Sequence, residues 1–309
     1  MARRRLGLPP VLFALASLAV LGSTVLGSAS AAPVGMAYLK IGAGAEAVAM
    51  GNAVVSNVEG PSATYWNPAA LAFQPGLQAT VAHNESFQSI RQEFAGITRS
   101  FGRLGLGVSL HGTWSDQLDS YDNAGIYQGK FGYYGISTGL AGGYQMSDSW
   151  SLGVGASYVR EQLDTYSADG ISLDAGVLGR DVFAGLDFGL ALLHLGPNLR
   201  YVDQQLSLPM TVQGGATYRL RLPSIGATAL LAAEVRKVRE EDPNLQLGVE
   251  YRLREVARLR LGYRSGLDSE DVSFGIGLHQ GSVQADYAYV PFGDDLGTQH
   301  RIGITYRRQ

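Results

Sequence analysis

The alternation of apolar and polar residues is the dominant pattern of this chain, and it is clearest between Leu245 and Arg307. In one segment, Leu245, Leu247, Val249, Tyr251 and Leu253 interleave with Gln246, Gly248, Glu250, Arg252 and Arg254. A period of two predicts a β-strand with one apolar face and one polar face. The polar face carries full charges, which a packed protein core does not normally accept. The pattern therefore predicts a barrel with an apolar outer surface and a polar interior.

The same alternation recurs from Leu77 onward and predicts fourteen strands. They span residues 77–86, 91–100, 103–114, 132–145, 149–160, 170–180, 182–194, 209–221, 227–238, 245–254, 257–265, 271–280, 282–291 and 298–308. Short turns and longer links alternate between them, as in barrels whose short turns face the periplasm and whose long loops face outside. The expected fold class is all-β: a transmembrane antiparallel β-barrel of about fourteen strands with an N-terminal plug segment.

The first thirty-one residues resemble an export signal. Arg3, Arg4 and Arg5 precede an uncharged stretch over residues 11–27, and Ala29-Ser30-Ala31 has the small-x-small pattern of a cleavage site. We expect residues 1–31 to be a cleaved signal peptide, with an uncleaved membrane anchor as the alternative. Because three arginines leave with the signal, a formal net charge of −3 becomes −6.

Residues 32–76 lack strand alternation and are rich in small side chains. Pro61 and the Asn67-Pro68 pair mark loops in this segment. We expect a compact plug that folds inside the barrel, with the wall occupying residues 77–309. The 41 glycines fit this expectation, since many lie on the polar phase of the strands, where small side chains leave room for a lumen or a plug.

Composition excludes several other classes of protein. The chain has no cysteine, so neither disulfides nor cysteine-bound metals stabilise it. No basic patch is dense enough to indicate nucleic acid. Nucleophile-elbow, zinc-protease and phosphate-loop motifs are absent, so we expect no enzyme and no cofactor.

Two strings near the chain ends resemble one family. Leu39 to Ala45 leads through Met50-Gly51-Asn52-Ala53 to Thr64-Tyr65-Trp66-Asn67-Pro68-Ala69-Ala70-Leu71. Near the other end stands Asp286-Tyr287-Ala288-Tyr289-Val290-Pro291-Phe292-Gly293-Asp294. Together they resemble the PorV/PorQ family, within the broader superfamily of FadL-like outer-membrane barrels. One departure is that such barrels usually end on an aromatic residue, whereas Arg307, Arg308 and Gln309 follow Tyr306 here.

The resemblance implies a fourteen-stranded outer-membrane barrel with an N-terminal plug, in which Trp66, Asn67, Pro68 and Ala69 form the plug motif. It implies a non-enzymatic role in type IX-like protein export or surface attachment, with outer-membrane lipid and exported cargo or secretion-system subunits as partners. The alternative is a FadL-like transporter of hydrophobic small molecules. Met50, Trp66 and Phe73 are then candidates to line the ligand pocket, although packing within the plug explains them as well.

The inward charges are the main candidate for chemistry. They are Arg219, Glu234, Arg236, Glu250, Arg252, Arg258, Arg260, Asp286 and Arg301. Because opposite signs stand on neighbouring strands, we favour a network that braces the barrel and holds the plug over an ion-selecting ring. Acidic loops, such as the one with Asp116, Asp119 and Asp122, lack the ordered spacing of a calcium loop, so we expect no metal site.

Overall fold

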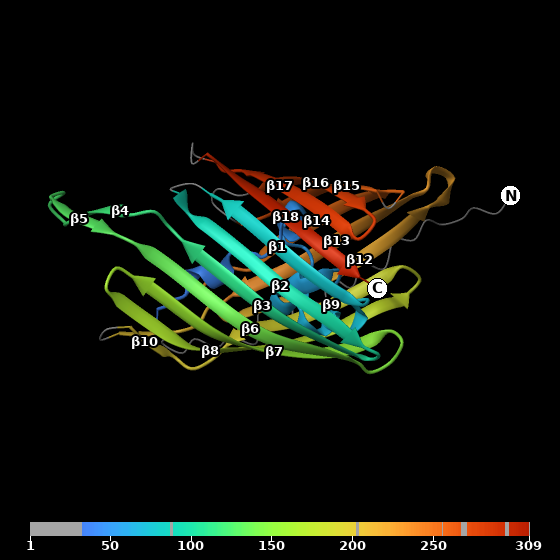
Figure 1. Ribbon diagram of the computed structural model, residues 1–309, viewed down its shortest axis with the longest axis horizontal. Coiled ribbons are helices and arrows are strands. Elements are labelled where there is room, and N and C mark those ends of the chain that lie inside the picture. Colours follow the sequence, from blue (N-terminus) through green and yellow to red (C-terminus); the bar gives the residue numbers. More distant parts are fainter. Residues whose placement is uncertain are drawn as a thin grey trace.

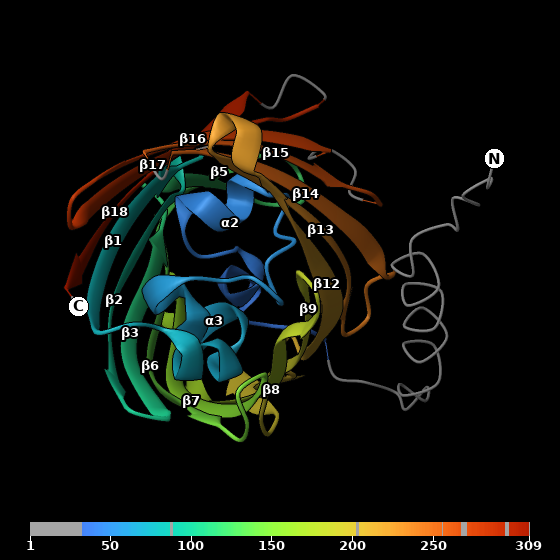
Figure 2. The same cartoon turned by 90° about the vertical axis from the view of Figure 1, so that its right-hand side faces the viewer.

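Fourteen antiparallel strands close into a barrel in the computed structural model (Figures 1 and 2), as the sequence predicts. The structure describes residues 33–86, 89–201, 204–254, 256–266, 271–293 and 297–308. The expected signal peptide lies outside the described residues. The strands follow one another around the wall in chain order, and β1 pairs with β18 to close it.

The predicted strands are confirmed, and their ends differ from the observed ones by a few residues in most cases. The wall strands are β1 (Leu77–Glu85), β2 (Arg91–Phe101), β3 (Leu104–Trp114), β6 (Tyr133–Gln145), β7 (Trp150–Leu163), β8 (Tyr166–Phe183), β9 (Leu186–Leu195), β12 (Thr211–Leu222), β13 (Ala227–Val238), β14 (Asn244–Leu253), β15 (Ala257–Arg264), β16 (Val272–Gln280), β17 (Val283–Pro291) and β18 (Thr298–Arg308). The expected loop over 161–169 is wrong, because β7 and β8 continue their ladder until Leu163 pairs with Tyr166.

Two further hairpins, which the sequence pattern did not reveal, lie within the long links. β4 (Leu118–Tyr121) pairs with β5 (Tyr127–Phe131), and β10 (Leu199–Tyr201) pairs with β11 (Gln204–Leu206). The β4–β5 hairpin projects past the barrel rim (Figure 1). We call this rim the loop end of the barrel. The opposite rim, where β1 begins and β18 ends, is the turn end.

The two faces of each strand separate as the alternation predicts. On β3, Leu106, Val108 and Leu110 are exposed on the outer surface, whereas Gly105 and Gly107 are buried inside. Leu140 on β6 and Val154 on β7 are 65% and 67% exposed, so the outer band is apolar where a bilayer would contact it. Among the described residues, no helix has the length and hydrophobicity to span a membrane.

The segment from Pro33 to Gly76 lies inside the barrel (Figure 2). We call it the plug. Its short elements are η1 (Ala37–Lys40), α2 (Ala45–Ala49), η2 (Gly60–Ser62), α3 (Ala63–Trp66) and η3 (Pro68–Phe73). Outside the plug, the 3₁₀ turn η5 (Pro223–Ile225) joins the wall strands β12 and β13. The plug forms the main apolar core, in which Trp66, Leu71 and Val58 pack with Leu178 of the wall. The barrel thus encloses a packed body.

Glycines on the inner face of the wall are matched to this body. A Cβ added to Gly105, Gly153 or Gly262 would lie closer than 3 Å to plug backbone atoms, a separation that real side chains do not show. The sequence left open whether small inward residues make room for a lumen or for a plug. At these positions they let the plug backbone approach the strands directly.

Candidate functional site between plug and wall

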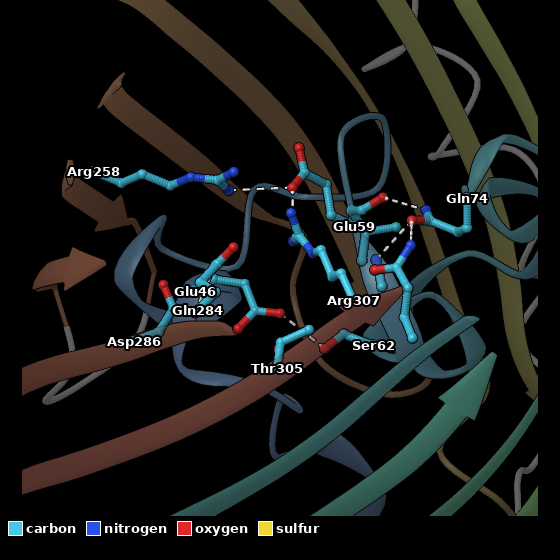
Figure 3. A network of polar contacts seen from close by, with 12 residues as sticks. Glu46, Glu59, Ser62, Gln74, Arg258, Gln284, Asp286, Thr305 and Arg307 are labelled. Atoms are coloured by element: carbon cyan, nitrogen blue, oxygen red, sulfur yellow. Dashed lines mark hydrogen bonds and ion pairs between the residues drawn. The ribbon is translucent and has the colours of Figure 1, made fainter. Parts of the chain in front are cut away.

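The inward charges concentrate on the side of the barrel formed by β13 to β18, where they meet the plug. At the turn end, three arginines of the wall pair with Glu59 of the plug, and Figure 3 shows two of them, Arg258 and Arg307. Its carboxylate lies 2.9 Å from Arg252, 3.2 Å from Arg258 and 3.1 Å from Arg307. The strands that carry these arginines, β14, β15 and β18, are therefore all joined to one plug side chain. We call this group the Glu59 cluster.

The charge state of Glu59 follows from these neighbours. Burial alone would raise the pKa of the Glu59 carboxyl. The guanidinium groups of Arg252, Arg258 and Arg307 outweigh burial and hold that pKa well below its usual range. Glu59 is therefore ionised at neutral pH, and the cluster of one carboxylate and three guanidinium groups carries a net positive charge.

A second group of charges lies in the wall next to α2. Arg260 donates to Glu250 at 2.6 Å and to Asp286 at 2.7 Å, and Arg252 also donates to Glu250. Glu46 of α2 accepts a hydrogen bond from Ser62 at 2.9 Å. Burial and the nearby Asp286 carboxylate raise the pKa of Glu46, so this plug carboxyl holds its proton to higher pH than usual.

The other inward charges each contact the plug or a neighbouring strand. Arg219 pairs with Asp187 at 2.9 Å, and Glu234 accepts from the Val55 backbone N–H at 2.9 Å. Arg236 donates to the Lys40 carbonyl at 3.3 Å, and Arg301 donates to the Gly42 carbonyl. These contacts fit the bracing interpretation. A functional role for the nine residues stays a prediction.

Sequence reasoning missed Asp187, the partner of Arg219, and three further members of this network, Glu46, Glu59 and Arg307. Glu46 and Glu59 lie in the plug, where no periodicity assigns a side chain to a face. Arg307 was detectable, because it continues the inward phase of β18 set by Arg301 and Thr305.

The plug motif makes hydrogen bonds within the plug and to the wall. Trp66 is fully buried, and its indole N–H donates to the Ala43 carbonyl at 2.9 Å. The Asn67 amide donates to Val55 at 2.9 Å and to Val177 of the wall at 3.2 Å, while its oxygen accepts from the Ala69 N–H. The motif thereby fixes both the plug's own turn and its position against β8.

The three residues proposed to line a hydrophobic pocket all belong to the apolar core of the plug, in which Met50 and Trp66 are buried and against which Phe73 packs. The Trp66 ring is enclosed within the plug core. Phe73 packs beneath the Arg180 guanidinium, 5.1 Å from the ring centroid. Met50 borders a narrow crevice of about 30 Å³ whose other neighbours include Glu59 and Arg260. The three side chains thus take part in one packed apolar core.

A larger cavity lies between plug and wall at the loop end. It measures about 370 Å³ and is bordered by η1 and by the loop-end portions of β13, β14, β15 and β18. Nine of its fourteen lining residues carry charged or amide side chains. Lys40 of η1 forms an ion pair with Glu241 across it at 2.8 Å. We call this space the loop-end cavity.

The wall is irregular where β8 meets β9. The register shifts between Leu173 and Ala175, and His194 adopts a left-handed backbone conformation with φ of 59°. The Asp174 carboxylate accepts from the His194 backbone N–H at 2.8 Å. Ser172 and Asp174 both face the same ring nitrogen of His194, at 3.5 and 3.9 Å, so these residues do not form a relay from acid to histidine to serine.

The three carboxylates in and beside the β4–β5 hairpin each contact a different partner. Asp116 pairs with Arg91 at 3.3 Å, and Asp119 lies 3.9 Å from Lys130. Asp122 accepts from the backbone N–H groups of Ala124 and Ile126, both at 2.9 Å. In the described ranges, no group of three or more metal-ligating side chains is assembled. The acidic residues Asp268, Glu270, Asp294 and Asp295 lie outside the described residues.

Comparison of the sequence with known proteins finds two relatives by name. The chain is 29% identical over 140 residues to the long-chain fatty acid transport protein of Escherichia coli O6:H1, covering 44% of this chain and 28% of that protein. It is 27% identical over 217 residues to outer membrane protein P1 of Haemophilus influenzae, covering 69% of this chain and 38% of that protein. The matches thus span about a third of each relative's length. No family model matches the chain.

Solved structures share the fold. The toluene transporter TodX of Pseudomonas putida has a TM-score of 0.65 at 14% identity, covering 86% of this chain and 97% of that one. A FadL homologue of Pseudomonas aeruginosa has a TM-score of 0.54 at 13% identity, covering 83% and 96%. The chain thus shares the closed barrel fold of these structures, and part of its sequence is similar to two proteins named as a fatty acid transport protein and an outer membrane protein. A PorV/PorQ assignment finds no support among them.

Proposed function

We propose that this chain carries hydrophobic small molecules across the outer membrane. The observation that carries the proposal is the closed barrel of the toluene transporter, matched over 86% of this chain and 97% of that one. A relative named as a long-chain fatty acid transport protein supports the same class of solute. This is the role that the sequence placed second, behind protein export.

The outer surface of the wall offers a place where an apolar solute meets the bilayer. A groove of about 680 Å³ runs over β2, β3, β6, β7 and β8 on the lipid-facing side. Its rim is formed by large side chains such as Leu106, Leu140 and Val154. Its lining includes the small residues Gly142 and Ala156. An apolar molecule in this groove contacts aliphatic side chains of the wall on one side and lipid chains on the other.

Protein export, the other hypothesis, requires a different structural feature from small-molecule transport. A cargo-binding role requires an exposed surface that recognises a peptide segment, and the named relatives do not support it. The two roles therefore make different predictions: only a transporter lets a small apolar solute cross the outer membrane in the absence of any protein partner.

An uptake assay tests the proposal. Cells lacking their own hydrophobic-solute transporter would express the chain, and entry of radiolabelled toluene and oleate would be timed against an empty-vector strain. Folding of the barrel is checked by the change of gel mobility on boiling. We expect initial uptake of at least one solute to rise several-fold. Vector-level uptake of both solutes by a folded barrel would contradict the proposal, and co-purification of an exported protein would then favour export.

A further inference from the structure

We propose that the lipid-facing groove over β2 to β8 binds one anionic phospholipid, whose phosphate lies between Arg99 and Arg308 and whose acyl chain lies in the groove. The site requires a barrel that lies in a bilayer, and it does not depend on solute transport. Three features of the outer surface support it: the course of the groove, the surroundings of Arg99, and the position of Arg308 beside Arg99.

The groove rises from the turn end into the apolar band. Two adjacent rows of outward residues, paired from strand to strand, line it: Arg99, Leu106, Gly142 and Val154 in one row, and Ile97, Val108, Leu140, Ala156 and Leu173 in the other. Arg99 lies two residues from Phe101, where β2 ends, whereas Ala156 lies six residues from Trp150, where β7 begins. Because neighbouring strands lie about 4.8 Å apart, five adjacent strands extend over about 19 Å. A space of this length suits an extended acyl chain.

Two small residues give the groove its depth. Gly142 pairs with Leu106 on one side and with Val154 on the other. In the next row, Ala156 stands between Leu140 and Leu173. An acyl chain that lies over the small residues therefore contacts large aliphatic side chains on both sides. Inside a bilayer water does not drive this contact, so the gain comes from close packing.

Arg99 places a positive charge at the turn-end mouth of the groove. Its side chain is exposed on the outer face, where Leu77 and Leu106 are its neighbours on the adjacent strands. Its guanidinium carbon lies 5.1 Å from the centroid of the Phe101 ring. Within the described ranges, no carboxylate forms an ion pair with Arg99. A guanidinium group beside lipid is costly unless it reaches water or an anionic partner.

A second guanidinium group stands beside the first. Leu77 of β1 pairs with Arg99 on one side and with Arg308 of β18 on the other, so the two arginine backbones lie about 10 Å apart, two strand spacings. Arg308 is also exposed on the outer face. The carboxylates of Glu85 and Glu93, on β1 and β2, lie toward the loop end instead. Arginine binds phosphate by charge-assisted hydrogen bonds, and a phosphate between these two side chains can accept from both.

The open side of the groove favours a phospholipid over a free fatty acid. The groove faces lipid along its length, so a molecule with two acyl chains can place one chain in it and leave the other in the bilayer. Phospholipids also greatly outnumber any solute in a membrane, and occupancy of a site follows the concentration of its ligand.

Native mass spectrometry of the purified full-length barrel tests the proposal. The barrel is mixed in detergent with equal amounts of phosphatidylglycerol, which is anionic, and phosphatidylcholine, which is zwitterionic, with the same acyl chains. We expect one bound phosphatidylglycerol, preferred more than tenfold. Arg99→Gln and Arg308→Gln should each lower this preference about fivefold, because each removes one cation beside the phosphate. Arg221→Gln, which changes an exposed arginine of β12 at the turn end, is the matched control and should leave the preference unchanged.

Filling the groove tests the acyl chain separately from the phosphate. The double variant Gly142→Leu/Ala156→Leu keeps the outer face apolar and should lower retention of phosphatidylglycerol several-fold. Gel mobility before and after boiling identifies any variant that does not fold, and the remaining variants then carry the test. Equal retention of both lipids by the wild type would overturn the proposal, since Arg99 would then simply reach water. An unchanged preference in folded Arg99→Gln, unchanged retention in the folded double variant, or retention of oleate in place of phosphatidylglycerol would also overturn it. Solute uptake is measured separately, so failure here is distinct from failure of transport.

Discussion

A Gly153→Val substitution is expected to prevent the plug from seating in the barrel. Gly153 faces inward on β7, and a Cβ there would overlap the backbone of Pro68 and Ala69 at the start of η3. Because the obstructing atoms are backbone rather than the end of a flexible side chain, no rotamer change relieves the overlap. Valine otherwise favours strands more than glycine does, so strand propensity alone predicts the opposite effect.

Gly142→Val is the matched control. Gly142 lies on the neighbouring strand β6, and an added Cβ there meets a side-chain carbon of Leu106 at 3.3 Å. Limited proteolysis of the folded barrel in detergent is the measurement. We expect rapid cleavage of the plug, or failure to fold, for Gly153→Val, and wild-type protection for Gly142→Val. Equal protection of the plug in both variants would show that η3 does not contact β7 in this way.

Truncation of Glu59 to alanine is the second large effect that we expect. It leaves Arg252, Arg258 and Arg307 close together at the turn end without their shared carboxylate. Removing one partner of a buried ion pair typically costs about 3–5 kcal/mol. Since the Glu59 side chain is 28% exposed, we expect a loss of about 3 kcal/mol, the lower end of that range.

The effect of Glu59→Ala should depend on pH. The pKa of Glu59 is depressed in the folded barrel, so its contribution is fully present above the unfolded pKa, near 4.5. It is lost as the pH falls through the folded value. Urea unfolding in detergent at several pH values measures the difference. Glu85→Ala, whose partner Arg91 lies 4.0 Å away on an exposed surface, should change stability little. A Glu59→Ala loss no larger than that of Glu85→Ala would contradict the role of the Glu59 cluster.

The wall was predictable from sequence because a barrel strand obeys one local rule. In each wall strand, successive side chains point alternately to the outer surface and to the interior. The apolar residues Leu104, Leu106 and Leu110 therefore identify the outer face of β3 from the sequence alone. The same rule failed for 161–169, where Tyr166 pairs with Leu163 above the apolar band and the alternation fades. It also missed the β4–β5 and β10–β11 hairpins, which form separate two-stranded sheets outside the closed barrel.

The contacts of the plug were not predictable, because each joins residues far apart in the chain. Glu59 reaches Arg252 and Arg307 across 193 and 248 positions, and nothing local in the sequence marks Glu59. The plug motif was visible, yet Trp66 and Asn67 serve the plug's own packing and its fit to β8. A motif that secures the plug does not by itself indicate what the barrel carries, so its contacts leave both the export and the transport hypotheses open.

The Glu59 cluster and the loop-end cavity both require a plug that is seated in the barrel, and a cross-link tests this seating most directly. The chain has no cysteine, and the side-chain oxygens of Ser56 in the plug and Thr217 on β12 lie 2.7 Å apart. Oxidation of Ser56→Cys/Thr217→Cys should give a disulfide that changes the mobility of the boiled protein until a reductant is added. Ser56→Cys/Tyr218→Cys, with its second cysteine on the outer face, should not react. A folded Ser56→Cys/Thr217→Cys barrel that forms no disulfide would contradict a plug seated against this wall.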